Sequence, residues 1–212
     1  MSKKYEMTIG GKSVPADGYT DIRNPANTEE VVGQAPIGSK SHLDQAVDAA
    51  AKAFETWRYS SDKDRADACN AIAQVCTDNA EELAVLLTRE QGKPLGGLGS
   101  QFEMGGSGAW AGYTASLTFE DKIIEDSDEK RIVQQRVPLG VVGSITPWNW
   151  PVMIAIMHIV PGNRTGNTVV IKPSPYTPLS TLRLVELIND VMQAGLVNVV
   201  SGGDELGAEL TG

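Results

Sequence analysis

Residues 138–151, PLGVVGSITPWNWP, contain an apolar run that ends abruptly in a proline-flanked loop, and they carry the clearest fold signal in the chain. Two further β-branched runs follow at similar spacing, at residues 168–171 and 197–200. Each run is separated from the one before it by a segment long enough for a helix. The pattern therefore predicts a β-α-β-α-β unit with right-handed crossovers, and so an α/β fold on a parallel sheet.

Ligands of such sheets bind beyond the carboxyl ends of the strands. Those ends are expected at residues 145–149, 172–174 and 201–203, and all three contain small, polar or basic residues. The last continues into SGGDELG, residues 201–207, a glycine-rich turn that opens a helix whose amides could face a pyrophosphate. This turn is not a G-x-G-x-x-G fingerprint, and alone it is weak evidence for a nucleotide.

The ordered segments PLGVVGSITPWNWP, GNTVVIKPS, TPLS and VNVVSGG resemble those of the NAD(P)-dependent aldehyde dehydrogenases, and the resemblance extends back to Asn24-Pro25-Ala26. In that family the general-base glutamate and the nucleophilic cysteine lie downstream of the position matching residue 212. The resemblance implies an incomplete Rossmann-like sheet in a truncated aldehyde dehydrogenase. The family reaction is NAD(P)-dependent oxidation of an aldehyde to a carboxylate, and we expect weak or absent cofactor binding and little or no turnover here.

The resemblance also implies roles for individual residues. Asn149 matches the oxyanion-hole asparagine, whose amide N–H stabilises charge on the reacting carbonyl oxygen; without its surroundings, it reads equally well as a loop residue capping a turn. Lys172 matches a lysine that contacts the adenosine ribose, and we expect its cation to point out over the sheet edge. Pro175 stands where NAD-preferring members often have glutamate, which leaves NAD or NADP open. The other cofactor-binding positions implied are Ile145, Thr146, Pro147, Trp148, Ser174, Gly203 and Gly207.

The N-terminal region is predicted to begin with a β-hairpin, because residues 1–38 alternate short β-like runs with turn signals such as Gly10-Gly11. Ser41 and Asp44 form a capping-box signature ahead of an amphipathic helix that continues to Trp57. Two further helices are expected, over residues 62–77 and from residue 78 to the break at Gly92-Lys93-Pro94.

A glycine-rich segment, residues 96–119, is predicted to form the weakest helix, because each interior glycine costs about 1 kcal/mol relative to alanine. Residues 121–129 read as an acidic turn, and residues 131–137 alternate like an edge strand. In the family the comparable stretch belongs to an arm used in subunit association; a solvated hairpin is the alternative. We expect residues 1–137 to form a hairpin, helical and arm region and residues 138–212 a partial dinucleotide-binding unit, folding as one cooperative unit.

The charge and the apolar content of the chain limit which classes of partner it can bind. A net charge of -9 and a pI near 4.7 lack the basic surface that nucleic acid or an anionic membrane requires. The longest apolar run, residues 152–160, is too short to span a bilayer, and residues 1–14 lack the apolar core of a signal peptide. We expect a cytoplasmic protein with no bound metal, in which Cys69 and Cys76, on one apolar helix face, are inert core thiols.

Three hypotheses remain open at this point. The first is a truncated dehydrogenase with residual NAD(P) binding, and the second is an oligomerisation or regulatory module that pairs with itself or a full-length relative. The third is an active oxidoreductase with another nucleophile, which no residue supports. The unfinished sheet and the arm at residues 131–137 are both expected to leave unpaired strand edges, which favours a homo-oligomer, most simply a dimer.

Overall fold

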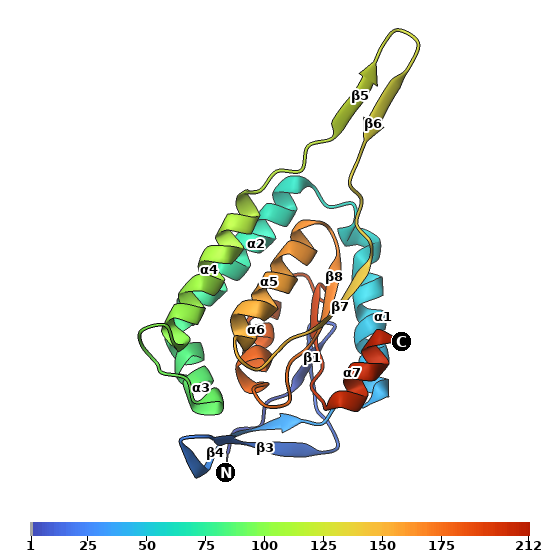
Figure 1. Cartoon of the computed structure of the whole chain (residues 1–212). Helices are drawn as coiled ribbons and strands as arrows, with labels where there is room; N and C mark the ends of the chain where they lie inside the picture. The colour runs from blue at the N-terminus through green and yellow to red at the C-terminus, as the bar shows by residue number, and fades with distance from the viewer. Residues whose placement is uncertain (1) are drawn as a thin grey trace.

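The structure, a computed structural model, describes residues 2–212 as a central sheet with helices on both faces and one projecting hairpin arm (Figure 1). The strands are β1 (Met7–Ile9), β2 (Lys12–Val14), β3 (Tyr19–Asn24), β4 (Asn27–Pro36), β5 (Lys122–Asp126), β6 (Arg131–Gln134), β7 (Val141–Ile145), β8 (Thr168–Lys172) and β9 (Val197–Val199). The helices are α1 (Lys40–Trp57), α2 (Asp62–Asp78), α3 (Ala80–Gln91), α4 (Ser100–Ser116), α5 (Pro151–Arg164), α6 (Leu179–Asn189) and α7 (Asp204–Thr211).

The predicted β-α-β-α-β unit is confirmed. Strands β7, β8 and β9 are parallel neighbours joined through α5 and α6, with Val141 opposite Thr168 and Val169 opposite Val197. Every residue of β8 is buried, because helices cover both faces of the sheet. Helices α1 and α7 cover one face, α5 and α6 cover the other, and α2 and α4 pack outside α5.

The sheet is mixed and not purely parallel, which corrects the sequence-based expectation. Its order is β2-β1-β9-β8-β7, with β1 antiparallel to β9 and to β2. Gly10 and Gly11 both have positive φ, 59° and 76°, as a tight two-residue hairpin turn requires. The N-terminal hairpin therefore extends the sheet along the free edge of β9, and residues from both halves of the chain share one core.

Helix α1 begins earlier than expected. Its N-cap is Ser39, and the capping box pairs Ser39 with His42 instead of Ser41 with Asp44. Helices α2 and α3 lie close to their predicted ranges, and α3 ends at Gly92, which has the left-handed φ of 86° typical of a helix C-terminus. Helix α4 is shorter than the glycine-rich segment that predicted it.

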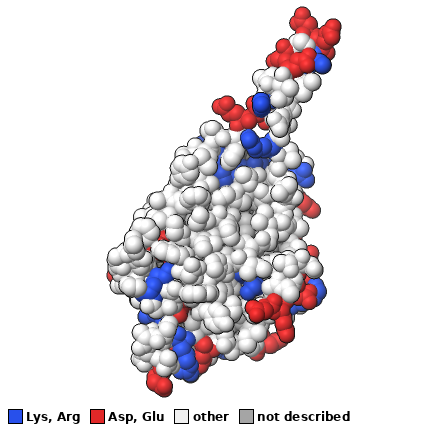
Figure 2. All heavy atoms as spheres, in the orientation of Figure 1, with Lys and Arg blue, Asp and Glu red and all other residues white. Residues whose placement is uncertain are grey.

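The projecting arm is a two-stranded hairpin of β5 and β6 (Figure 1). The acidic segment that was interpreted as a turn forms β5, and the turn itself follows Asp126. Charged side chains crowd the far end of this arm (Figure 2). Two consecutive apolar residues of β5 are also exposed, Ile123 at 51% and Ile124 at 54%.

A second hairpin, β3–β4, lies beyond the carboxyl ends of the parallel strands and contacts α3 and α6 (Figure 1). Within residues 2–212, β7 pairs with β8 alone, so its other edge is unpaired. None of the helices in this range has the length and apolar character needed to cross a membrane.

Candidate functional site

The loops that follow β7 and β8 are tied to each other at the carboxyl edge of the sheet. The backbone N–H of Thr146 donates to the carbonyl of Lys172 at 3.0 Å. The Thr177 hydroxyl lies 3.4 Å from the carbonyl of Trp148, to which it donates. Thr146 is buried, at 3% exposed, whereas Trp148 is 56% exposed. The loop after β7 therefore has a fixed base and an accessible tip.

Lys172 lies at this edge but does not point freely into solvent, which differs from the sequence-based expectation. Its residue is only 3% exposed, and Nζ donates to the carbonyls of Pro173 and Gly202, at 3.2 and 3.1 Å. Burial lowers the pKa of Lys172, and the negative charge of Asp204 partly opposes this. The ammonium thus links the loop after β8 to the loop after β9.

Helix α7 begins beside this lysine. Gly203 is its N-cap residue, and a Cβ there would meet no atom within 4 Å. A Cβ on Gly207 would lie 3.3 Å from Cε of Lys172 and 3.9 Å from Cδ1 of Ile145. The structure therefore brings together three of the residues expected at the carboxyl edge of the sheet, Ile145, Lys172 and Gly207. Asp204 and Glu205, however, place two carboxylates in the first turn of α7.

Asn149 lies in the exposed part of the loop between β7 and α5. Its carbonyl accepts a hydrogen bond of 2.7 Å from Nζ of Lys93, which comes from the break between α3 and α4. That ammonium also lies 4.3 Å from the ring centroid of Trp150. A cation from a distant segment therefore contacts both the Asn149 backbone and the Trp150 ring, while the Asn149 side chain makes no hydrogen bond to residues 2–212.

Glu103 of α4 completes this arrangement. The carboxylate is fully buried and accepts from Nζ of Lys93 at 2.5 Å. Its other oxygen accepts from the backbone N–H groups of Val152 and Met153, at 2.9 and 3.0 Å. These donors belong to the first turn of α5, which has no intrahelical partners for them. Glu103 thus caps α5 and anchors Lys93 at once.

The sequence-based interpretation missed Lys93 and Glu103. One signal could have revealed Glu103: it is a lone acidic residue among the small and apolar residues on one face of a glycine-rich helix. Such a carboxylate needs a buried partner. The cation in the Gly92-Lys93-Pro94 break was an available partner.

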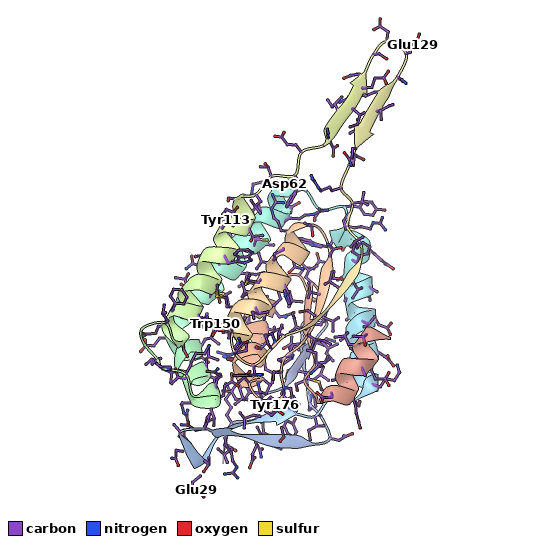
Figure 3. The ribbon with its side chains drawn as sticks, viewed as in Figure 1. Glu29, Asp62, Tyr113, Glu129, Trp150 and Tyr176 are labelled. Carbon is purple, nitrogen blue, oxygen red and sulfur yellow. The ribbon has the colours of Figure 1, made fainter. Side chains whose placement is uncertain are left out.

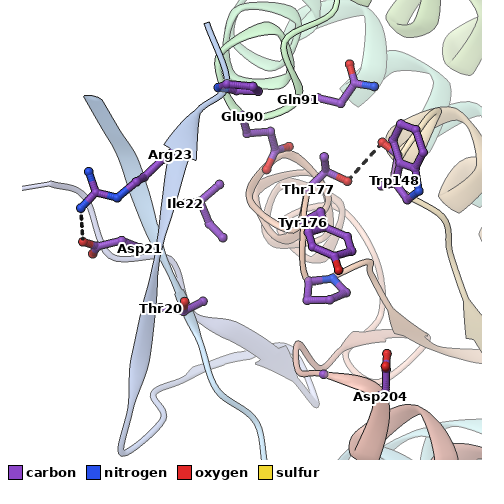
Figure 4. Close-up of a pocket in the computed structure, with 13 residues that line it drawn as sticks. Thr20, Asp21, Ile22, Arg23, Glu90, Gln91, Trp148, Tyr176, Thr177 and Asp204 are labelled. Carbon is purple, nitrogen blue, oxygen red and sulfur yellow. Dashed lines mark hydrogen bonds and ion pairs between the residues drawn. The ribbon is translucent and has the colours of Figure 1, made fainter. Parts of the chain in front are cut away.

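A cavity of about 690 Å³ separates the carboxyl edge of the sheet from β3 (Figure 4). Trp148, Tyr176 and Asp204 line its sheet side, and Asp21 and Arg23 line the opposite wall (Figure 4). Two of the predicted cofactor residues, Trp148 and Gly203, line this cavity, whereas Lys172 and Gly207 are buried and are not among its lining residues.

Glu90, of α3, also lines the cavity. It is 2% exposed and accepts from the backbone N–H groups of Leu179 and Ser180, at 2.7 and 2.9 Å, and from the Ser180 hydroxyl. Burial raises the pKa of Glu90 to about 7, against the opposing effect of these hydrogen bonds. Glu90 therefore caps α6 as Glu103 caps α5.

Neither cysteine belongs to this site. Cys69 and Cys76 are both fully buried in the main core. Burial raises the pKa of each thiol to about 12. The prediction that both are inert core thiols agrees with this placement, because a reactive cysteine needs an exposed, electropositive setting.

Comparison with known proteins identifies relatives over almost the whole chain. A sequence model described as "Aldehyde dehydrogenase family" matches residues 14–212. A probable aldehyde dehydrogenase from a Pseudomonas species is 38% identical over 210 residues, which cover 98% of this chain and 42% of that protein. The chain thus spans less than half the length of the curated relatives that it matches.

Solved structures give the same result. Lactaldehyde dehydrogenase from Escherichia coli superposes with a TM-score of 0.93 at 30% identity, covering 100% of this chain and 45% of that one. A betaine aldehyde dehydrogenase from Staphylococcus aureus, solved in complex with NAD+, gives a TM-score of 0.91 at 31% identity. That match covers 98% of this chain and 44% of the betaine aldehyde dehydrogenase.

Proposed function

Because this chain belongs to the aldehyde dehydrogenase family, whose reaction is the oxidation of aldehydes with NAD(P), we propose that it forms the cofactor-facing half of such a site. The observation that supports this is the meeting of Ile145, Lys172 and Gly207 at the carboxyl edge of the sheet, where ligands of such folds bind. When bound, NAD(P) would supply the hydride acceptor. The two buried thiols agree with a reducing compartment such as the cytoplasm.

The residues present fit a dinucleotide only in part. Gly203 leaves the first turn of α7 open, and amides at a helix N-terminus favour an anion. Asp204 and Glu205 already occupy that turn with negative charge, which repels a pyrophosphate. The Lys172 ammonium already donates two hydrogen bonds to backbone carbonyls of this chain, which leaves one N–H for a ligand. Binding of NAD or NADP should therefore be weak.

We assign Asn149 the role of oxyanion donor. Its side chain is exposed and free of partners within residues 2–212, so its amide N–H is available to a carbonyl oxygen that gains negative charge. Lys93 holds the Asn149 carbonyl and so fixes the backbone from which that amide projects. Residues 1–212 alone should show no significant aldehyde oxidation, because both thiols are buried away from Asn149 and losing a nucleophile removes most of the rate.

Calorimetric titration with NAD and with NADP tests this assignment. Lys172→Ala should weaken nucleotide binding, whereas Asn149→Ala should leave it nearly unchanged, because Asn149 acts on the aldehyde oxygen. Equal losses in both variants would contradict the separation of roles. An absorbance assay with a panel of aldehydes follows in the same samples, and NADH formation that survives in the Cys69→Ser, Cys76→Ser double variant would show that another group does the chemistry.

A second candidate function is association with another copy of the chain. The unpaired edge of β7 exposes backbone donors and acceptors, and the β5–β6 arm presents Ile123, Ile124 and Ile132, the last 42% exposed. Unpaired edges with apolar side chains are templates for another chain. We propose a two-fold dimer, and light scattering across a dilution series that shows a compact monomer would refute it.

A further inference from the structure

A second cavity, of about 530 Å³, lies at the foot of the β5–β6 arm, at the opposite end of the sheet from the candidate cofactor site. Figure 3 shows Asp62, which lines it, close to the arm, and Tyr176 of the first cavity at the far end. Blue atoms gather at the same foot of the arm in Figure 2. The residues that line the cavity are Asp62, Arg65, Phe119, Arg136, Val137, Leu139, Arg164, Thr165 and Asn167.

This cavity concentrates positive charge in an acidic protein. Arg65, Arg136 and Arg164 line it, and Asp62 is the one carboxylate among its lining residues. Asp62 is already committed, because its Oδ1 accepts from Nη1 of Arg164 at 2.6 Å, and that hydrogen bond lowers the pKa of Asp62. Three guanidinium groups against one carboxylate leave a formal excess of two positive charges, in a chain whose net charge is -9.

Arg164 is a fixed part of the wall. Its side chain is 1% exposed, its Nη2 donates to the carbonyl of Leu117, and its guanidinium carbon lies 5.2 Å from the ring centroid of Phe119. Its Nε is buried and has no hydrogen-bond partner among residues 2–212. A fully buried guanidinium with an unpaired donor adds positive potential to the cavity that Asp62, itself mostly exposed, only partly neutralises.

The Arg65 guanidinium is held in place by hydrogen bonds to the segment that precedes α2. Its Nε donates to the Ser60 hydroxyl and its Nη2 to the carbonyl of Arg58, both at 2.9 Å. A Cβ at Gly166, where φ is +84°, would lie 2.6 Å from the guanidinium carbon, so the group stacks directly on the bare backbone there. Burial lowers the pKa of Arg65, and the charge of Arg164 lowers it further. Nη1 of Arg65 makes no hydrogen bond within residues 2–212.

Arg136 provides a free cation at the rim. Its side chain is exposed, and no ion pair or hydrogen bond involves it within the described chain. Beside it Val137 is 72% and Leu139 93% exposed, while Phe119 is 40% exposed. The cavity thus combines two available guanidinium groups with an apolar rim.

We propose that this cavity binds a small phosphate monoester with an apolar substituent. Guanidinium groups match phosphate oxygens in pairs, and a monoester carries a charge near -2 at neutral pH, which equals the excess in the cavity. Phe119, Val137 and Leu139 would cover the apolar part of the molecule. A volume of about 530 Å³ is within the range typical of small-molecule sites.

Calorimetry with phenyl phosphate as the probe tests the site. Arg136→Gln should weaken binding roughly tenfold, the usual effect of losing one hydrogen bond to a charged group. Arg65→Gln should do the same. Arg131→Gln, an exposed arginine of the arm, is the matched control and should change the affinity less than twofold. Benzoate, with one charge, should bind more weakly than phenyl phosphate, and inorganic phosphate should lose the apolar contribution.

Several results would overturn the proposal. Absence of binding, equal affinity for phenyl phosphate in Arg136→Gln and the parent protein, or equal affinity for inorganic phosphate would each do so. A loss in Lys172→Ala without a loss in Arg136→Gln would place the probe at the cofactor edge instead. Arg136 is exposed and makes no hydrogen bond or ion pair within residues 2–212, so we expect Arg136→Gln to fold and to remain informative even if Arg65→Gln proves unstable.

Discussion

Replacing Glu103 with alanine should destabilise the protein by about 3 kcal/mol, the largest effect that we expect from any single polar residue near the candidate site. The substitution removes a fully buried carboxylate and leaves Lys93, whose side chain is 11% exposed, without its anionic partner. Two backbone N–H groups, those of Val152 and Met153, lose their acceptor at the same time.

The magnitude follows from these contacts. Breaking a buried ion pair on one side costs about 3–5 kcal/mol, because an uncompensated charge remains. The lower end applies here, since Lys93 keeps the Asn149 carbonyl and the face of the Trp150 ring as partners. The N–H of Val152, a fully buried residue, would lose its acceptor, so the substitution cannot leave the free energy of unfolding unchanged.

Urea unfolding followed by circular dichroism measures the effect as a change in the free energy of unfolding. Glu103→Gln should cost less than Glu103→Ala, because the amide oxygen still accepts from the first turn of α5. Glu55→Ala, on the exposed face of α1, is the matched control and should change stability by less than about 0.5 kcal/mol. A Glu103→Ala loss no larger than that of the control would refute the assignment of Glu103 as the cap of α5 and the anchor of Lys93.

Other perturbations have equally definite outcomes. Burial raises the pKa of Glu90 from 4.5 to about 7, so the contribution of Glu90 to stability is fully present below pH 4.5 and is lost as pH rises to 7. Over that window the free energy of unfolding, relative to that of Glu90→Gln, should fall by up to roughly 3 kcal/mol. A difference in urea unfolding that does not change with pH would contradict the burial argument. Cys69 and Cys76 should react with a thiol reagent such as 5,5'-dithiobis(2-nitrobenzoate) only when the protein opens, and rapid labelling of the native protein would show that they are accessible. Gly166→Ala should cost more than about 1 kcal/mol in thermal or urea unfolding, because a Cβ there is strained by φ and collides with Arg65; a neutral result would mean that this guanidinium moves away freely.

Local sequence rules located most of the elements. The β-branched runs and their spacing predicted β7, β8 and β9, and the apolar periodicity predicted α1, α2 and α3 close to their observed bounds. Rules of this kind succeed where the signal lies within a few residues. They failed at the start of α1, where the N-cap is Ser39 and not Ser41. Both serines can cap a helix, and local sequence does not show which one the preceding loop places at the N-cap.

In the candidate site, too, some residues were predictable from local motifs and others were not. Ile145, Lys172 and Gly207 were predicted from motifs at strand ends, and topology alone brings such ends to one edge. Whether Lys172 points outward was not decidable from the motif, because its burial depends on the carbonyl of Gly202, thirty residues along the chain. The contacts of Lys93 with Asn149 and of Glu103 with the first turn of α5 were not predictable for the same reason, because these partners lie about fifty residues away in the chain.

The family resemblance, the parallel β-α-β-α-β order and the carboxyl edge at which Ile145 and Lys172 lie all follow from short periodic runs and contiguous motifs in the sequence. The mixed sheet, the buried caps at Glu90 and Glu103, and the arginine cavity at the foot of the arm become visible only in the three-dimensional arrangement. Each of these depends on groups far apart in the chain, and their positions are set by how the helices pack around the sheet. Arg65 and Arg164 show this most clearly, since they lie 99 positions apart in the sequence and both line one cavity.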